Sequence, residues 1–205
     1  MKSLFRCAAV ALALICATTG LAQSSTDASV VFVAHSDRPM ITLEREHGMV
    51  RGLVERPLLY VYGDGLVRVE RPAYMINPGV FEYRLKADEL TQLIASLDGD
   101  GVMTIDSTTL RAERDAAALA MRSASGERYF TSDTTVTRIK FDFASYARAG
   151  ARPAPLGNAL RYSDLQIDAL RYPQLEDLAA LANAEKRLLA LIDRPSMATS
   201  GGADR

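Results

Sequence analysis

The chain has 205 residues, of which 48% are hydrophobic and 24% are charged, a composition typical of an ordinary globular domain. This length is enough for one domain with a substantial core. Its 24 basic and 25 acidic residues leave a net charge of −1, and this balance does not favour nucleic acid as a partner.

The first 22 residues have the pattern of a signal peptide. Lys2 and Arg6 form a basic start, residues 7–17 form an apolar core, and small residues precede a cleavage site after Ala22. The apolar run is too short for a permanent membrane anchor, and no later run approaches its length. We therefore expect an exported, soluble mature protein without a transmembrane anchor, located in the periplasm or the extracellular medium.

Both cysteines, Cys7 and Cys16, lie inside this leader. The mature chain then has no disulfide, no thiol nucleophile and no zinc–thiolate site. Removal of the leader also takes away two basic residues, which leaves 22 against 25 acidic ones and a net charge of −3. Lipidation at Cys16 is the alternative, but Ile15 stands where a lipoprotein site prefers a small residue.

Two short strands are expected first, over residues 30–34 and 40–44, with the former buried and the pair separated by Arg38-Pro39. A surface connection over residues 46–56 follows. The clearest structural signal in the chain comes next, at residues 57–97, where strand, tight turn, strand, loop, strand and helix patterns succeed one another.

Gly63-Asp64-Gly65 predicts a β-hairpin, because glycine reaches positive φ without a Cβ clash. Two registers are possible. A two-residue loop would place on one face Leu58, Tyr60, Tyr62, Val67 and Val69. A three-residue loop with Gly65 left-handed would instead align Leu59, Val61, Val67 and Val69. We favour the second register because Arg68 and Glu70 then share the opposite face with the tyrosines.

Asn77-Pro78-Gly79 predicts a type II turn with Gly79 in the left-handed position. The following strand alternates apolar and charged residues over 81–86. A helix is then expected from the spacing of Leu90, Leu93, Ile94 and Leu97, with Gly99 as its stop. Lys86 offers no capping oxygen, so packing on the sheet must hold this helix.

The second half continues with helix and strand patterns. Residues 106–109 can cap a helix that runs to about Arg122, and residues 132–134 form the turn of a second hairpin whose return strand covers 136–143. Residues 148–157 indicate an irregular crossing, and a further strand is expected near Leu160 and Tyr162. Ser163 and Gln166 fit a capping box for a short helix. Pro173 is expected to open the last helix, which ends near residue 192.

These elements predict the α+β class, with an antiparallel meander sheet packed mainly on one face by helices. The expected organisation is a signal peptide over residues 1–22, a single α+β domain over 23–194 and a disordered tail over 195–205.

The chain resembles secreted bacterial proteins of unknown function that share a YGDG-type β-meander followed by a helix. The resemblance rests on Tyr62-Gly63-Asp64-Gly65-Leu66-Val67, Tyr74-Met75, Gly79, Leu85, Glu89-Leu90, Ser132-Asp133 and the Tyr172-Pro173 helix. It covers most of the mature chain and implies an exported α+β domain. It supplies no activity and no site residue.

Candidate catalytic groups are scarce. The sequence contains no nucleotide-binding glycine loop, no H-E-x-x-H and no G-x-S-x-G. His35 lies beside Ser36 and Asp37, and His47 lies near Glu44 and Glu46, so a small hydrolase is formally possible; a hydrogen-bonded or solvated loop histidine is the simpler interpretation. The Asp98-Gly-Asp100-Gly run departs from a calcium loop at its later ligand positions. We therefore expect no catalytic residue, no metal site and no cofactor.

Tyr60, Tyr62 and Tyr74 lie near one hairpin and could form a platform for a sugar or a peptide, although a second packed layer would explain them equally well. Glu185 falls inside the apolar stripe of the last helix. A carboxylate facing a core needs a partner, so we expect an Arg or a Tyr beside it. A buried functional carboxylate and a surface residue reaching water are the alternatives.

Three functions stay open from the sequence. The first, which we favour, is an exported non-catalytic binding or interaction protein. The second is a small hydrolase that uses His35 or His47 with a carboxylate. The third is an envelope structural or assembly factor with an envelope protein as its partner. The identity of any ligand or partner does not follow from the sequence.

Overall fold

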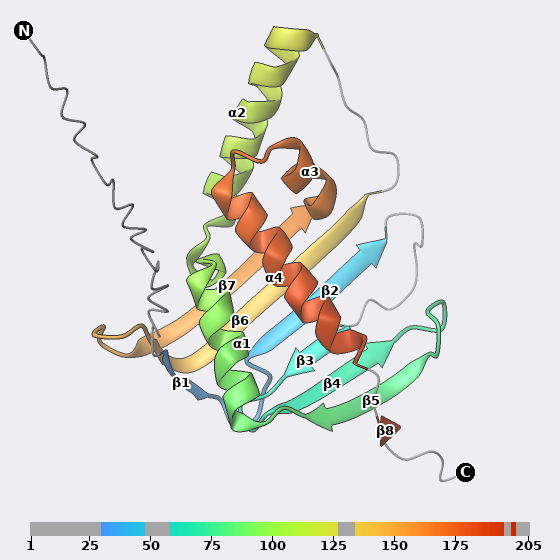
Figure 1. Ribbon diagram of the computed structural model, residues 1–205, viewed down its shortest axis with the longest axis vertical. Coiled ribbons are helices and arrows are strands. Elements are labelled where there is room, and N and C mark those ends of the chain that lie inside the picture. Colours follow the sequence, from blue (N-terminus) through green and yellow to red (C-terminus); the bar gives the residue numbers. More distant parts are fainter. Residues whose placement is uncertain (1–29, 48–57, 127–133, 195–197, 200–205) are drawn as a thin grey trace, which may run out of the picture.

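The computed structural model describes residues 30–47, 58–126, 134–194 and 198–199, and they form one antiparallel sheet with helices on one face (Figure 1). The fold is therefore α+β, as expected. The strands are β1 (Val31–Ala34), β2 (Ile41–His47), β3 (Leu59–Val61), β4 (Leu66–Arg71), β5 (Gly79–Arg84), β6 (Thr135–Ala147), β7 (Ala154–Ser163) and β8 (Ala198–Thr199).

The long strand β6 organises the sheet. One edge of β6 pairs with β7, and the other edge pairs first with β2 and then with β1. The meander continues outward from β2 through β3, β4 and β5 to β8. Because β6 and β2 pair along the whole of β2, the ends of these two strands lie together, at Arg45 opposite Thr137.

The β3–β4 hairpin has the three-residue loop. Leu59 pairs with Val69 and Val61 pairs with Val67, and Gly65 has a φ of +83°. A Cβ atom at Gly65 would lie 2.5 Å from the carbonyl oxygen of Leu85, so both the backbone conformation and the space require glycine. The favoured register is confirmed.

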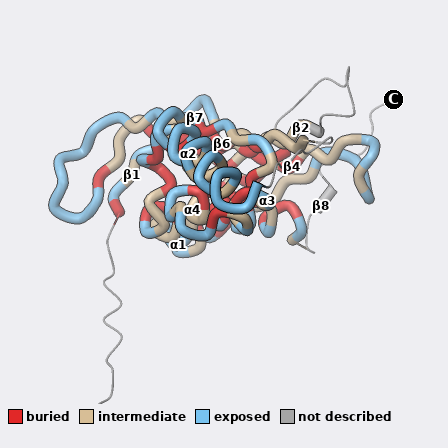
Figure 2. Tube along the Cα trace, turned by 90° about the horizontal axis from the view of Figure 1, so that it is seen from above, coloured by how far each residue is buried: buried red, intermediate tan, exposed pale blue. Residues whose placement is uncertain are grey.

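The two faces of the sheet differ in chemistry. One face is buried under the helices and carries apolar side chains, among them Ile41, Leu43, Leu59, Val61, Val67, Val69, Ile139, Phe141 and Leu160. The alternate residues of the same strands point to the other face and are mostly charged, including Glu44, Arg68, Glu70, Glu82, Arg138, Lys140 and Asp142. Buried segments thus concentrate between the sheet and the helices (Figure 2).

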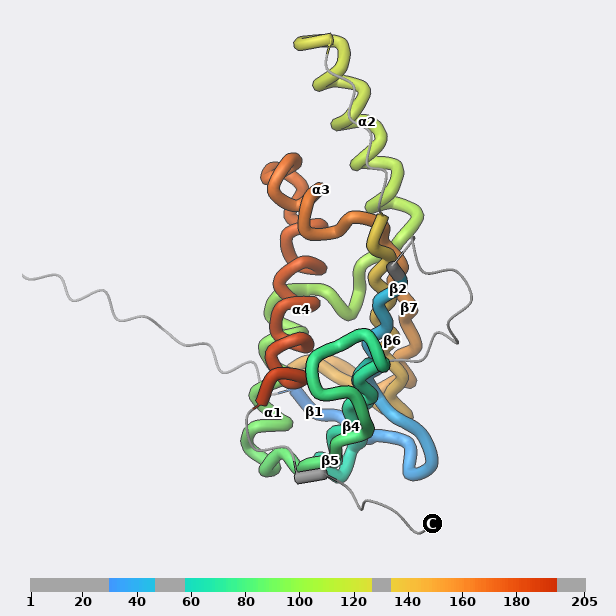
Figure 3. The backbone as a smooth tube through the Cα atoms, turned by 90° about the vertical axis from the view of Figure 1, so that its right-hand side faces the viewer, coloured from blue at the N-terminus to red at the C-terminus, as the bar shows by residue number. Residues whose placement is uncertain are grey.

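The helices are α1 (Ala87–Gly99), α2 (Ser107–Ser125), α3 (Leu165–Arg171) and α4 (Glu176–Ile192), with a 3₁₀ turn η1 at Val102–Thr104. α1 and α4 lie across the sheet, whereas α2 projects beyond the body of the molecule (Figures 1 and 3). Leu110 is the one fully buried residue of α2. Among the described residues, no helix has the length and hydropathy that a membrane span requires.

Several expected element ends are wrong. β1 was expected to be buried, but Val31 and Val33 are 60% and 55% exposed because they alternate with Phe32 and Ala34, which pack against the core. The end of α1 is as expected, because the helix stops at Gly99; the left-handed residue that follows it is Gly101, with φ of +77°. In the second turn Asn77 is left-handed and Gly79, with φ of +139°, already pairs with Arg71, so the connection is wider than a type II turn.

The second half shows three further differences. Residues 154–157 belong to β7 instead of an irregular crossing. Asp164, not Ser163, precedes α3, and it has a left-handed φ of +57°. α4 begins at Glu176, so Pro173 lies in the preceding turn rather than in the helix.

Two other expectations concern segments that the structure describes only in part or not at all. The second hairpin was expected to have its first arm at residues 129–130, which lie outside the described residues. Its expected return strand lies in β6, which pairs with β2 and β7. The segment 195–205, expected to be disordered, supplies the two residues of β8, which pair with Phe81 and Glu82 of β5.

Candidate functional site

A pocket of about 170 Å³ opens where the ends of β2 and β6 meet α3 and α4. β2 contributes one arginine, β6 two threonines, the β7–α3 junction and α3 four residues, and α4 one glutamate. The lining residues are Arg45, Thr135, Thr137, Asp164, Leu165, Gln166, Ile167 and Glu185. Six of these eight side chains are polar, which sets the pocket apart from the apolar interior beside it.

Glu185 belongs to this pocket and is 1% exposed. Its Oε1 accepts a hydrogen bond of 2.6 Å from the Thr137 hydroxyl, and its Oε2 accepts one of 2.6 Å from Gln166 Nε2. Arg45 Nε lies 3.3 Å from Oε1. The carboxylate is therefore held by one cation and two neutral donors, as a buried charge requires.

The sequence argument expected an Arg or a Tyr beside Glu185, and the structure supplies Arg45. It missed Thr137 and Gln166. Strand alternation places Thr137 on the apolar face of β6, and Gln166 lies in the first turn of α3, so the sequence indicated the face of one and the helix turn of the other. What the sequence could not supply is the pairing of β2 with β6, which brings Arg45 and Thr137 together across a gap of 92 residues.

Asp164 holds the rim of the pocket at the junction of β7 and α3. Its backbone N–H donates to the Thr135 carbonyl at 2.8 Å, and its Oδ1 accepts from the Thr135 N–H at 3.2 Å. Asn and Asp are the non-glycine residues that best tolerate a left-handed backbone, so an aspartate fits this position.

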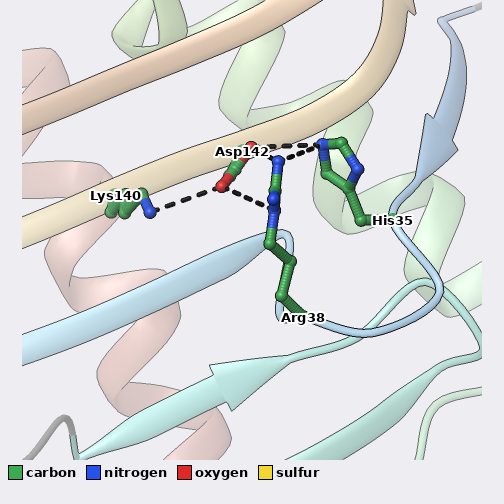
Figure 4. Close-up of polar contacts among 4 residues, drawn as sticks. All are labelled: His35, Arg38, Lys140 and Asp142. Carbon is green, nitrogen blue, oxygen red and sulfur yellow. Dashed lines mark hydrogen bonds and ion pairs between the residues drawn. The ribbon is translucent and has the colours of Figure 1, made fainter.

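A second polar cluster lies on the open face of the sheet and surrounds Asp142 (Figure 4). Arg38 approaches both carboxylate oxygens, through Nε at 3.1 Å and Nη2 at 3.3 Å. Lys140 Nζ and His35 Nε2 each lie 3.3 Å from the same group. Partial burial opposes ionisation of Asp142, but Lys140 and Arg38 outweigh it and hold the pKa of this carboxyl below its ordinary value of 3.8.

His35 thus reaches a carboxylate, as the hydrolase hypothesis requires, but its geometry does not suit a general base. Its Nε2 lies 2.8 Å from Arg38 Nη2, and a guanidinium can only donate, so the lone pair of Nε2 is occupied. Within the described residues, no serine or threonine hydroxyl forms a hydrogen bond with His35. His47 ends β2, and its side chain lies outside the described part of the chain.

The three tyrosines proposed as a platform lie at different places along the β3–β4 hairpin. Tyr60 points to the open face opposite Arg68, and Tyr62 lies beside the hairpin loop. Tyr74 lies in the connection after β4, at the far end of that strand, and is 52% exposed. Tyr62 and Tyr74 therefore lie at opposite ends of β4, and Tyr60 lies beside its middle.

Two more buried carboxylates were missed by the sequence argument. Asp98 accepts from the Tyr146 hydroxyl and, at 2.7 Å, from Arg148 Nε. Asp168 accepts from Arg114 Nε at 2.9 Å and from the Tyr162 hydroxyl at 3.0 Å. Burial, followed by the adjacent carboxylate, raises the pKa of both tyrosines. Each of these groups ties a helix to β6 or β7 and is not among the residues that line the pocket.

Comparison with known proteins adds no relative: no family model, no curated protein and no solved structure matches this chain.

Proposed function

We propose that this chain is an exported, non-catalytic binding protein and that it binds a small molecule in the pocket at Glu185. The observation that carries the proposal is the pocket itself, where six polar side chains from four separate segments converge beside an apolar wall. Small-molecule sites are concave and use precisely placed polar groups to orient the ligand, and this pocket supplies such groups. The leader sequence supports export.

The state of Glu185 supports binding over catalysis. A general base must reach a proton of the substrate, whereas Glu185 is 1% exposed and its two oxygens are already held by Thr137 and Gln166. The network fixes the side chain in one orientation, which suits a group that positions others. Glu185 is then a structural element of the site that orients Arg45 and Gln166.

The other two hypotheses are less well supported. The hydrolase would have to use His35, whose Nε2 lies against Arg38. An exposed apolar face on the last helix would favour an assembly factor, but α4 buries its apolar stripe against the sheet, with Leu178, Leu181, Leu188 and Ile192 all under 3% exposed. Neither arrangement offers a surface comparable to the pocket.

Native mass spectrometry of the mature protein, purified from its own exported fraction, tests the proposal. We expect a population carrying a small-molecule adduct. The matched variant is Ile167→Trp, which fills the pocket from its exposed wall and should remove the adduct at an unchanged denaturation midpoint. Absence of an adduct from the parent, or an adduct that persists in Ile167→Trp, would contradict the proposal.

A further inference from the structure

The structure assigns a ligand class to this pocket: we infer that it binds an amino-acid-like group, in which a primary ammonium and a carbonyl or carboxylate group are bonded to the same carbon. This inference rests on the proposed binding function. It follows from the donors and acceptors that the pocket leaves unused, from its charge and from its size.

Arg45 supplies the unused donors. Within the described residues its guanidinium contacts one side chain, Glu185, and that contact is made through Nε. Even this buried Nε–H lacks an acceptor in hydrogen-bond geometry. The Nη groups thus have no acceptor from the described part of the protein. A guanidinium held by a carboxylate on one side presents its other donors as a planar fork, which matches a carbonyl or carboxylate oxygen.

Asp164 and Gln166 supply the unused acceptors. Oδ1 of Asp164 accepts from the Thr135 N–H, and among the described residues Oδ2 has no donor. The Nε2 amide of Gln166 donates to Glu185 and to the Ala182 carbonyl, which leaves Gln166 Oε1 as an acceptor that no described residue uses. Two oxygens, one of them charged, are suited to an ammonium with its three donors.

The charge of the pocket also favours an ammonium. Glu185 and Asp164 are opposed by Arg45 alone, so the lining carries one surplus negative charge. A simple anion would gain from Arg45 but would meet two carboxylates. A ligand that places its cation at Asp164 and its oxygen at Arg45 satisfies both charged groups.

Size and the apolar wall limit the rest of the ligand. The cavity of about 170 Å³ is smaller than the roughly 300–1,000 Å³ typical of drug-sized ligands. Leu165 and Ile167 line it on the α3 side. A single aliphatic side chain attached to the amino-acid-like group fills this space, and a longer substituent must leave through the open side.

Titrations monitored by amide chemical shifts test the inference with four probes that share the isobutyl side chain of leucine. L-leucine and L-leucinamide carry both polar groups, 3-methylbutylamine carries only the ammonium, and 4-methylpentanoate carries only the carboxylate. We expect leucine or leucinamide to bind and to shift the amides of Thr137, Asp164 and Gln166. Each one-group probe should bind about ten- to hundred-fold more weakly, as expected for loss of a hydrogen-bonded charge. Tighter binding of leucinamide would identify an aminoacyl or peptide source, and tighter binding of leucine a free amino acid.

Two variants locate the contacts without removing the pocket. Asp164→Asn keeps the Oδ1 acceptor and tolerates the left-handed backbone, but it removes the charge; Arg45→Lys keeps the partner of Glu185 but removes the fork. Each should weaken binding about ten-fold or more. The matched controls are Asp193→Asn and Arg111→Lys, at exposed positions outside the pocket, and they should leave binding unchanged.

Failure of both two-group probes to bind, or binding that Asp164→Asn and Arg45→Lys leave unchanged, would overturn the inferred ligand class. If native mass spectrometry still showed an adduct that Ile167→Trp removes, the binding function would stand and only the ligand class would be wrong. If neither probe bound and native mass spectrometry showed no adduct, the binding function would be rejected as well.

Discussion

Arg45 on β2 and Glu185 on α4 form an ion pair, with Nε 3.3 Å from Oε1, that ties the end of the sheet to the last helix. Glu185 is 1% exposed, whereas the Arg45 side chain is 28% exposed. The carboxylate of the pair is therefore buried, and its cation is partly open to solvent. The carboxylate faces inward because it lies on the apolar stripe of α4. The cation reaches it because Arg45 lies on the core face of β2. The Arg45–Thr137 pair is the next pair on that face after Leu43–Ile139.

Substitutions of Glu185 test this pair. Glu185→Leu removes the acceptor of Thr137 and Gln166 and leaves the Arg45 charge without its partner, so we expect a loss of about 2–4 kcal/mol in the free energy of unfolding. Glu185→Gln keeps an acceptor and should cost less. Chemical denaturation measures both, and the double variant Arg45→Leu/Glu185→Leu should recover part of the loss. If both single variants unfold like the parent, the pair contributes nothing to stability.

Gly65→Val tests the hairpin. The new side chain would need a φ of +83° and a Cβ atom 2.5 Å from the Leu85 carbonyl oxygen, so we expect a loss of about 1–3 kcal/mol or more. Gly157→Val is the matched control, because a Cβ atom there meets no atom within 4 Å and the residue lies in β7. Equal denaturation midpoints for the two variants would contradict the requirement for glycine at residue 65.

The register of this hairpin and the partner type of Glu185 could be argued from sequence because both are local periodicity problems. Alternation fixes which strand residues share a face once the turn is known, and helical spacing fixes which residues share a stripe. Gly63-Asp64-Gly65 and the leucines of α4 provide those signals directly.

The rest depends on contacts between distant segments. The start of β7 was missed because Ala154-Pro155 has little strand propensity, and its pairing with β6 outweighs that. Pro173 was placed in α4 on its preference for a first helical position, but a turn in which the Leu175 N–H donates to the Tyr172 carbonyl comes first. The pocket combines β2, β6, α3 and α4, and no sequence spacing predicts that meeting.

Removal of a histidine should leave the protein intact. His35→Ala deletes an acceptor of Arg38 on the open sheet face, where Arg38 and Lys140 still hold Asp142, so the free energy of unfolding should change by less than about 1 kcal/mol. His47→Ala should likewise preserve the fold. Loss of ligand binding or of an activity in either variant, at an unchanged denaturation midpoint, would favour the hydrolase hypothesis.

Tyr83 should make stability fall at alkaline pH. Its hydroxyl donates to the Leu191 carbonyl at 2.8 Å, and burial raises its pKa from 10.0 to about 12. Because the folded pKa exceeds the unfolded one, this contribution is complete below about pH 10 and is lost as pH rises toward 12. Denaturation at about pH 9 and about pH 11 should show a smaller decrease for Tyr83→Phe than for the parent. Equal decreases would mean that folding does not raise the pKa of Tyr83.

Export should remove the leader after Ala22. N-terminal sequencing of the protein from the exported fraction should begin at Gln23, since small residues precede that bond. A chain that begins at Met1, or one that carries an acyl group on Cys16, would contradict the expected processing. Mass measurement of the intact chain distinguishes these outcomes.

The central claim is that the pocket on the Arg45–Glu185 pair is the binding site, and a crystal structure of the mature protein purified from its own exported fraction, with no ligand added, tests it most directly. We predict electron density for a small molecule that contacts Arg45 at one end and Asp164 at the other, with Glu185 still bonded to Thr137 and Gln166. Density for ordered water alone in this pocket, together with a bound molecule elsewhere on the protein, would contradict the claim.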